Sequence, residues 1–225
     1  MTTKLKSRAA KEEQLQVITK RRGGRPTKEH AAAMSDQLLD GARSSFARKG
    51  IANASLEEIA AELGVSKHTI YRRYPNKSAL LEAVVKRDLD RFRVALSVAA
   101  TEKNDALDAL HSVALRYFLF GTDREYSAFY LSLLAEAVVS APLRQRLADW
   151  SSIALEPFRD AIVLAQDADA IRPGDAWSIC GILVDLLEGA NNRVRLGVPD
   201  FADDADRRTL FDERWNFFLA AMGEH

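Results

Sequence analysis

Apolar residues recur every three or four positions through most of the chain, which is the spacing of one face of an α-helix. Glycine, proline and short polar runs separate these stretches. No segment shows the alternation of apolar and polar residues that is typical of a β-strand. The expected helical segments are 27–49, 55–63, 66–74, 77–100, 104–120, 124–139, 142–168, 174–197 and 204–222. The pattern therefore predicts an all-α protein.

Several of these segments carry their own start and stop signals. Ser55 is followed three residues later by Glu58, the pair that forms a capping box at the start of a helix. Gly50 is expected to end the first segment in a left-handed conformation. Pro157 lies inside segment 142–168, and proline lacks the amide hydrogen that a helix interior needs. That segment is therefore expected to be kinked or split.

Residues 55–74 carry the pattern of a helix-turn-helix. The small Ala60 lets two helices cross closely, and Gly64 supplies the turn between them. Four apolar side chains would fill the wedge between these helices and the one before: Ile59, Leu63, Val65 and Ile70. The second helix, at about 66–74, then presents groups suited to phosphates and base edges in a DNA major groove. The alternative is an ordinary helical hairpin with a solvated basic face.

Charge is divided unevenly along the chain, although its net charge is zero. Residues 1–93 hold 20 Lys and Arg against 11 Asp and Glu, a net charge of +9. Residues 94–225 carry the balance of −9. A basic first part that coincides with a helix-turn-helix pattern favours a polyanionic partner such as DNA.

The basic residues 1–26 are poor in aromatic side chains, so we expect a flexible arm. Only a short helix around 9–19 is compatible with their pattern. The run Arg22-Gly23-Gly24-Arg25-Pro26 resembles a hook that lays arginine into an A/T-rich minor groove. The alternative is a tail that adds only nonspecific attraction to DNA. In both cases the arm should raise the affinity for DNA.

Other classes of protein find little support in the sequence. The chain has no nucleophile elbow, no zinc-protease motif, no phosphate-binding glycine loop and no Cys-x-x-Cys, so we expect neither an enzyme nor a cofactor. Its four histidines are scattered and Cys180 is its single cysteine, so we expect no metal site and no internal disulfide. No apolar run could span a bilayer and no secretory signal begins the chain, which favours a cytoplasmic protein without a membrane partner. The basic arm and second helix argue against an interaction protein that binds no DNA.

A family signature follows the turn. The chain has the run Gly64-Val65-Ser66-Lys67-His68-Thr69-Ile70-Tyr71-Arg72-Arg73-Tyr74-Pro75-Asn76-Lys77-Ser78-Ala79-Leu80-Leu81. This run resembles the Gly-Val-Ser-x-x-Thr-Ile/Leu-Tyr-x-x-Phe-x-x-Lys-x-x-Leu signature of the TetR family of transcriptional regulators. Tyr74 stands where the family usually has Phe and keeps the ring. The resemblance extends over residues 38–85.

The resemblance implies an N-terminal three-helix helix-turn-helix DNA-binding domain at 27–85, behind the arm. A larger helical ligand-binding and dimerisation domain would follow at 86–225. The family further implies a homodimeric repressor that binds a palindromic operator in double-stranded DNA and is released by a small-molecule ligand. A transcriptional activator or a nucleoid-associated DNA binder that uses the same module stays open as the alternative.

The resemblance also implies which residues contact DNA. Thr69, Tyr71 and Lys77 would bind backbone phosphates. His68 lies where family members vary most, so we expect it to determine sequence preference. The complete set of expected DNA contacts is Arg25, Thr27, Ser55, Ser66, Lys67, His68, Thr69, Tyr71, Arg72 and Lys77.

Aromatic residues are frequent in the segments between 104 and 168, where family members often hold an effector. A pocket there would suit a hydrophobic or aromatic small molecule. The expected lining residues are His111, Tyr117, Phe118, Phe129, Tyr130, Leu133, Trp150 and Phe158. The alternative is that this aromatic stripe belongs to the core.

The last two segments, 174–197 and 204–222, are the expected dimer interface, because the resemblance implies a four-helix bundle across a two-fold axis. Their expected interface residues are Trp177, Leu183, Leu187, Phe211, Trp215 and Phe218. The alternative is that these apolar stripes face the core of their own subunit.

Overall fold

The computed structural model describes residues 28–197 and 203–223. Outside these ranges lie the predicted arm, its short helix and two of the candidate DNA contacts: 1–26, 9–19, Arg25 and Thr27.

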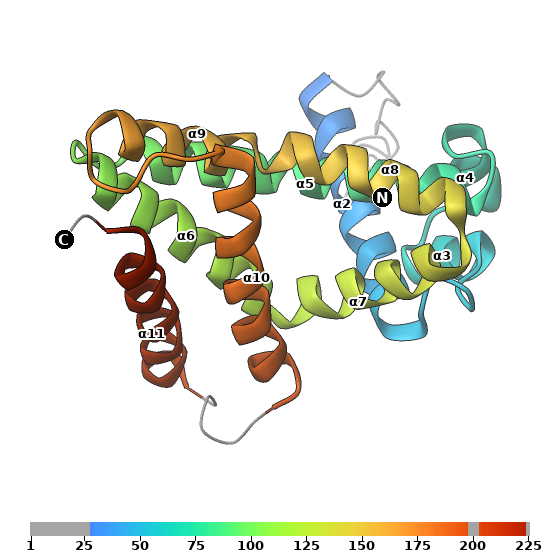
Figure 1. The fold of residues 1–225 in the computed structure, drawn as a ribbon. Coiled ribbons are helices and arrows are strands. Elements are labelled where there is room, and N and C mark those ends of the chain that lie inside the picture. The colour runs from blue at the N-terminus through green and yellow to red at the C-terminus, as the bar shows by residue number, and fades with distance from the viewer. Residues whose placement is uncertain (1–27, 198–202, 224–225) are drawn as a thin grey trace, which may run out of the picture. The chain divides into compact units, whose positions relative to one another are not determined.

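Every regular element within the described ranges is an α-helix (Figure 1), which confirms the predicted all-α class. The chain divides into two units, residues 1–37 and residues 38–225. The second unit contains the helix-turn-helix and all of the helices that follow it. No helix in the described part of the chain is both long and apolar enough to cross a membrane.

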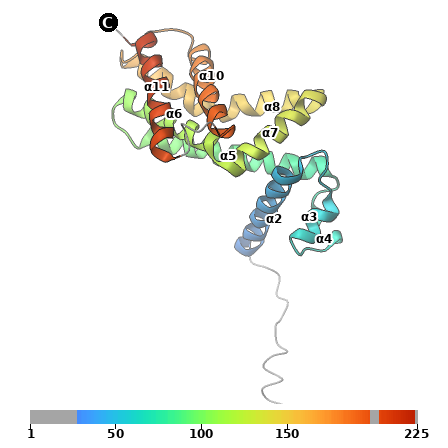
Figure 2. The ribbon, with the colours of Figure 1, turned by 90° about the horizontal axis from the view of Figure 1, so that it is seen from below.

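Among the described residues, three helices make up the N-terminal part of the fold: α2 (Lys28–Lys49), α3 (Leu56–Glu62) and α4 (Lys67–Arg73). Helices α3 and α4 lie side by side (Figure 2). Side-chain oxygens of Ser55 and Ser66 cap their N-termini by accepting from backbone amides of the first turn. Ile59 and Ile70 are fully buried in the wedge, as the sequence pattern predicts.

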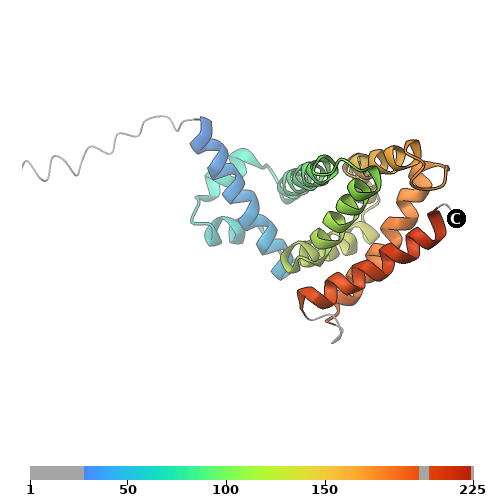
Figure 3. The ribbon, with the colours of Figure 1, turned by 90° about the vertical axis from the view of Figure 1, so that its left-hand side faces the viewer.

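Within 77–197 and 203–223 seven further helices follow: α5 (Lys77–Thr101), α6 (Ala106–Thr122), α7 (Arg124–Val139), α8 (Ala141–Ala154), α9 (Glu156–Asp167), α10 (Ala176–Arg195) and α11 (Asp204–Met222). Helices α8 and α9 follow one another along α5 (Figure 1). They take the place of the segment expected at 142–168, and Pro157 lies in the first turn of α9, where its missing amide hydrogen costs no helical bond. The predicted split is confirmed. Helix α11 lies beside α6 and α10 (Figure 3).

Buried apolar side chains of the described residues gather in two clusters, and α5 contributes to both. Leu80 and Val84, near the start of α5, join the cluster that contains Phe46 of α2. Leu96, farther along α5, joins the cluster that contains Phe211 of α11. Helix α5 therefore connects the core of the helix-turn-helix part with the core of the larger part.

Helix α7 makes a second connection between these two parts. The ring of Phe129 stacks on that of Phe46 in α2, with 6.3 Å between the ring centres. The hydroxyl of Ser132 accepts a hydrogen bond of 3.0 Å from the backbone amide of Ile51, which follows α2. A displacement of α7 would therefore be transmitted directly to α2 and to the loop that follows α2.

Candidate DNA-binding surface and ligand cavity

The turn between α3 and α4 is closed by backbone hydrogen bonds. The amide of Val65 donates to the carbonyl of Ala60 over 3.0 Å, and Gly64 takes a φ of 64°. This left-handed conformation favours glycine, which has no Cβ to clash. The capping box at Ser55 is complete, since Glu58 N donates to its hydroxyl over 3.2 Å and its own amide donates to Glu58 Oε2 over 3.3 Å. These two hydrogen bonds fix the position at which α3 begins.

Helix α4 presents its polar residues to solvent on a short, well-capped element. Ser66 Oγ accepts from the amide of Thr69 over 3.1 Å and lies 2.8 Å from the Thr69 hydroxyl. Lys67, His68 and Arg72 are exposed, and they give α4 cationic and hydrogen-bonding side chains of different lengths. Such a surface can contact both phosphates and base edges.

Glu57 of α3 holds two of the expected DNA contacts. Its Oε1 accepts a hydrogen bond of 2.7 Å from the Tyr71 hydroxyl and lies 2.9 Å from Lys67 Nζ. The same ammonium group lies 5.6 Å from the centre of the Tyr71 ring. The hydrogen bond from Lys67 and then that from Tyr71 lower the pKa of Glu57 to about 2. A carboxylate therefore occupies the place between these two donors that a phosphate oxygen could take.

Lys77, the third expected phosphate contact, lies at the start of α5. Its ammonium group donates to the carbonyls of Ile51 and Ala52, each over 2.8 Å. Lys77 therefore ties the loop after α2 to α5 when DNA is absent. Tyr74 is buried and belongs to the same core cluster as Phe46 and Leu80.

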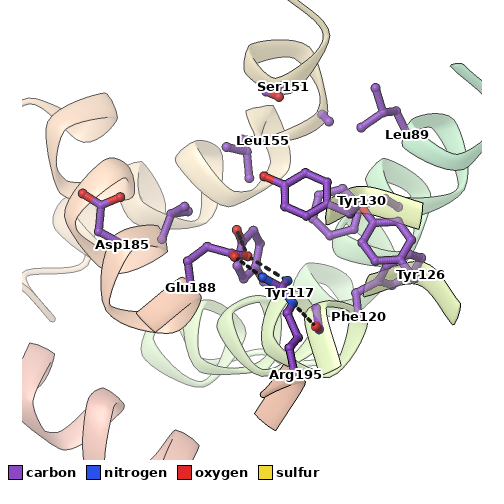
Figure 4. Close-up of a pocket in the computed structure, with 14 residues that line it drawn as sticks. Leu89, Tyr117, Phe120, Tyr126, Tyr130, Ser151, Leu155, Asp185, Glu188 and Arg195 are labelled. Atoms are coloured by element: carbon purple, nitrogen blue, oxygen red, sulfur yellow. Dashed lines mark hydrogen bonds and ion pairs between the residues drawn. The ribbon is translucent and has the colours of Figure 1, made fainter. Parts of the chain in front are cut away.

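A large cavity with a volume of about 280 Å³ lies between α5, α6, α7, α8 and α10 (Figure 4). Much of its wall is aromatic, from five rings: Phe92, Tyr117, Phe120, Tyr126 and Tyr130. Asp185, Glu188 and Arg195 of α10 are the charged residues that line it. A smaller cavity of about 40 Å³ shares Tyr126 and Tyr130 with it.

Glu188 is the centre of a polar cluster in the cavity wall (Figure 4). It accepts hydrogen bonds from the Tyr117 hydroxyl over 2.9 Å, from Arg195 Nη1 over 2.7 Å and from Asn191 Nδ2 over 3.3 Å. Arg195 Nε also donates to the carbonyl of Gly121 over 3.1 Å. The cluster joins α6 to α10 through side chains that are buried or partly buried.

The cavity tyrosines remain protonated at neutral pH. Removal from water raises the pKa of Tyr117 well above its usual range, and Glu188 raises it further. The pKa of Tyr126 is raised mainly by burial and next by Tyr130. The phenols are therefore neutral rings and hydrogen-bond donors rather than phenolate anions.

Comparison with known proteins places this geometry in a family. A sequence profile for bacterial regulatory proteins of the tetR family matches residues 38–84. The HTH-type transcriptional repressor Rv1474c of Mycobacterium tuberculosis is 32% identical over 194 residues, which cover 81% of this chain and 98% of that protein. The chain belongs to the TetR family. The TetR family consists of regulators rather than enzymes, in agreement with the motifs of the sequence.

Other TetR proteins match in part or in fold. The negative regulator IcaR of the biofilm operon icaADBC in Staphylococcus aureus is 26% identical over 100 residues, 44% of this chain and 53% of IcaR. The match thus spans about half the length of that relative. A proposed TetR-family regulator from Mesorhizobium loti has the same fold, with a TM-score of 0.74 at 21% identity over 88% of this chain and all of the other. For one from Rhodococcus sp. the TM-score is 0.66 at 25% identity, over 81% of this chain and 97% of the other.

The TetR-like pocket residues expected from the sequence lie in several places. Tyr117 and Tyr130 line the large cavity, while Phe129 and Leu133 line the small one beside it. The other four lie outside both cavities. Phe118 and Phe158 are fully buried core residues, Trp150 borders a separate surface hollow, and the His111 ring packs on Phe211 and Trp215.

The expected TetR dimer residues require a correction. Five of them are buried within the subunit and cannot present a surface to a second copy: Leu183, Leu187, Phe211, Trp215 and Phe218. Trp177 is the exception and is 42% exposed. The outward faces of these helices instead carry Ile182, which is 58% exposed, and Phe217, which is 66% exposed. Both stripes of α10 are apolar, so helical periodicity alone did not distinguish them.

The sequence reasoning missed several residues of the two sites, among them Glu57, Glu188 and Arg195. Glu57 lies in an unremarkable acidic pair at the start of α3, and its partners are 10 and 14 positions away. Glu188 and Arg195 are seven residues apart, two helical turns, which is a signal that could have placed them on one face of α10. Their joint contacts with α6 depend on the tertiary fold.

Proposed function

We propose that this protein is a homodimeric TetR-type repressor that binds a palindromic DNA operator and is released by a small molecule. Residues 27–85 form the DNA-binding domain in this proposal, and residues 86–225 form the ligand-binding and dimerisation domain. The observation that carries it is the surface of α4, where Lys67, His68 and Arg72 are exposed beside a tight turn. Two such surfaces in a dimer would read two half-sites of a palindrome.

Footprinting on DNA upstream of the protein's own gene tests the DNA-binding half. We expect protection of a palindrome at moderate salt. Lys77→Ala should weaken binding on all sequences and reduce the salt dependence by about one phosphate contact. Lys86→Ala is the matched control, because Lys86 is an exposed lysine on α5 outside the helix-turn-helix. His68→Ala should instead change the preferred sequence, and an unchanged preference would contradict its assignment.

The arm is proposed to contribute to the same complex through Arg25 and Thr27. Deletion of residues 1–24 should weaken operator binding and flatten its dependence on salt, because basic residues that neutralise phosphates release counterions. The measurement is a titration at several salt concentrations. An unchanged salt slope would show that the arm makes no phosphate contact.

The dimer is proposed to form through the outward faces of α10 and α11. Ile182 and Leu186 are one helical turn apart on α10, and Leu186 borders a shallow depression together with Phe217 of α11. Ile182→Glu and Phe217→Glu should each produce a monomer in sedimentation experiments and weaken operator binding. Leu164→Glu is the control, because Leu164 on α9 is 56% exposed and lies outside this face. A dimeric Phe217→Glu variant would place the interface elsewhere.

The effector is proposed to be an apolar or aromatic molecule that binds the large cavity. The volume and aromatic wall of the cavity support this proposal. Two proteins of similar fold are complexes with small molecules: one from Saccharomonospora viridis with choline, at 20% identity and a TM-score of 0.71, and SmeT with triclosan, at 22% and 0.68. An effector that binds the DNA-free state more tightly than the DNA-bound state would weaken operator binding by the ratio of these two affinities.

A further inference from the structure

We infer that the large cavity binds an organic cation, a compact positively charged group with apolar substituents such as a quaternary ammonium. This inference rests on the proposed function, because it assigns a ligand class to the proposed effector site. It depends on three features of the described residues: a continuous aromatic wall, an excess of acidic groups and a ring face that already holds a cation.

The aromatic wall is one connected series of rings. Phe92 lies 5.8 Å from Tyr117 and 5.1 Å from Phe120, with the rings edge to face. Phe120 lies 4.9 Å from Tyr126, and Tyr126 is nearly parallel to Tyr130 at 6.2 Å. The faces of such rings carry partial negative charge and attract a cation, most strongly where water is excluded.

Charged residues in the cavity wall add a net negative charge. Asp185 and Glu188 are acidic and Arg195 is basic, which leaves a balance of −1. Arg195 pairs with Glu188, whereas Asp185 is exposed and has no ion-pair partner in the described part of the chain. Removal from water raises the pKa of Tyr130 most, and Glu188 raises it further while Arg195 lowers it.

The small adjoining cavity adds a further carboxylate. Asp88 lines it and is 5% exposed. Its Oδ1 accepts from Arg87 Nη2 over 2.7 Å, but its Oδ2 has no hydrogen-bond partner among the described residues. Arg43 Nη1 lies 3.6 Å from Oδ2, so Asp88 is paired with both Arg87 and Arg43. Asp88 therefore adds a buried hydrogen-bond acceptor to the wall beside Tyr126 and Tyr130, and the negative balance of the site comes from Asp185 and Glu188.

Arg195 shows that this wall holds a cation and also disfavours an anionic ligand. Its guanidinium group lies 5.6 Å from the centre of the Tyr130 ring. Most of its hydrogen-bond donors are already used, since Nε donates to Gly121 O, Nη1 donates to Glu188 and to Asn192 Oδ1, and Nη2 lies 3.5 Å from Glu188 Oε1. An anion that bound Arg195 in place of Glu188 would have to displace the 2.7 Å bond between them and leave that carboxylate unpaired.

Calorimetric titration of the full-length protein with three probes of similar shape tests the charge class. The probes are benzyltrimethylammonium, its uncharged carbon isostere neopentylbenzene and the anion benzylphosphonate. We expect the cation to bind about tenfold more tightly than the isostere, and the anion to bind most weakly. Equal or tighter binding of the isostere or of the anion overturns the inference.

Variants locate the binding. Asp185→Asn should weaken binding of the cation several-fold and leave the isostere unchanged, and because Asp185 is exposed this test does not depend on folding. Asp167→Asn is the matched control, since this exposed residue at the end of α9 lines neither cavity. Tyr130→Phe should keep cation binding because it keeps the ring, whereas Tyr130→Leu should lose it. An Asp185→Asn protein that binds the cation as tightly as the wild type overturns the inference.

The same probes added to the protein–operator complex separate this inference from the proposed function. Cation binding to the free protein without release of DNA supports the ligand class and contradicts the effector role. Release by neopentylbenzene alone supports the effector role and overturns the ligand class. A protein that binds the cation but no specific DNA contradicts the proposed repressor while the ligand class stands.

Discussion

Gly121→Ala is expected to damage the contact between α6 and α10. A Cβ at this position would lie 2.7 Å from Cγ of Asn191 and closer still to its Nδ2, and it would lie 3.2 Å from Arg195 Nη2. Asn191 is fully buried and bonded to Glu188, so its side chain cannot move aside without losing that hydrogen bond. The two helices must separate, or the Glu188 cluster must break.

Overpacking an interior typically lowers the free energy of unfolding by about 1–3 kcal/mol. Replacing glycine within a helix returns at most about 1 kcal/mol, and less near a helix end such as this one. We therefore expect a net loss of about 1–2 kcal/mol, and a fall in Tm of about 2–4 °C for each kcal/mol in a chain of this size.

Thermal and urea denaturation followed by circular dichroism measure this loss, at equal protein concentrations because a dimer gains stability by mass action. Gly189→Ala is the control, since a Cβ there meets no atom within 4 Å and should stabilise α10 by about 0.5–1 kcal/mol. A Gly121→Ala variant as stable as the wild type would contradict the close contact between Gly121 of α6 and Asn191 of α10.

Three further predictions concern single groups. Glu57→Gln should tighten DNA binding on all sequences in an anisotropy titration, because it removes a negative charge from the surface proposed to face phosphates. Weaker binding would mean that Glu57 positions Tyr71 instead. Burial raises the pKa of Cys180 to about 12, so a thiol reagent at neutral pH should label it only on unfolding, and rapid labelling of the native protein would contradict this. Burial lowers the pKa of His111 below its usual 6.5, so the unfolded state binds a proton first on acidification. Stability should therefore fall as the pH drops below 6.5, and His111→Gln should reduce that dependence.

The helices and their ends were largely accessible to sequence reasoning because they are decided locally. Ser55 with Glu58 and Ser66 cap α3 and α4 from within a few residues, and Pro157 begins a new helix where it was expected to disturb one. These signals act over a single turn and need no knowledge of the tertiary fold.

Placement of the sites depends on contacts that periodicity does not encode. Leu183 and Ile182 are neighbours of similar hydrophobicity, but one faces the core and the other faces solvent, because α6, α9 and α11 pack on one side of α10. Tyr117 and Glu188 meet across 71 residues, so the polar cluster could be recognised only after α6 and α10 were packed together. The sequence therefore did not show which apolar face of a helix is buried, or which distant polar groups form pairs.

Helix α7 offers one stripe to the cavity, through Tyr126 and Tyr130, and another to the helix-turn-helix part, through Phe129. A ligand and a DNA duplex that prefer different positions of this helix are thermodynamically linked, and linkage is reciprocal. A ligand that weakens DNA binding a hundredfold must itself be bound a hundredfold more weakly by the complex. Because nonspecific chromosomal sites engage the same module, the amount of competing DNA in the cell would set the ligand concentration at which the operator becomes vacant.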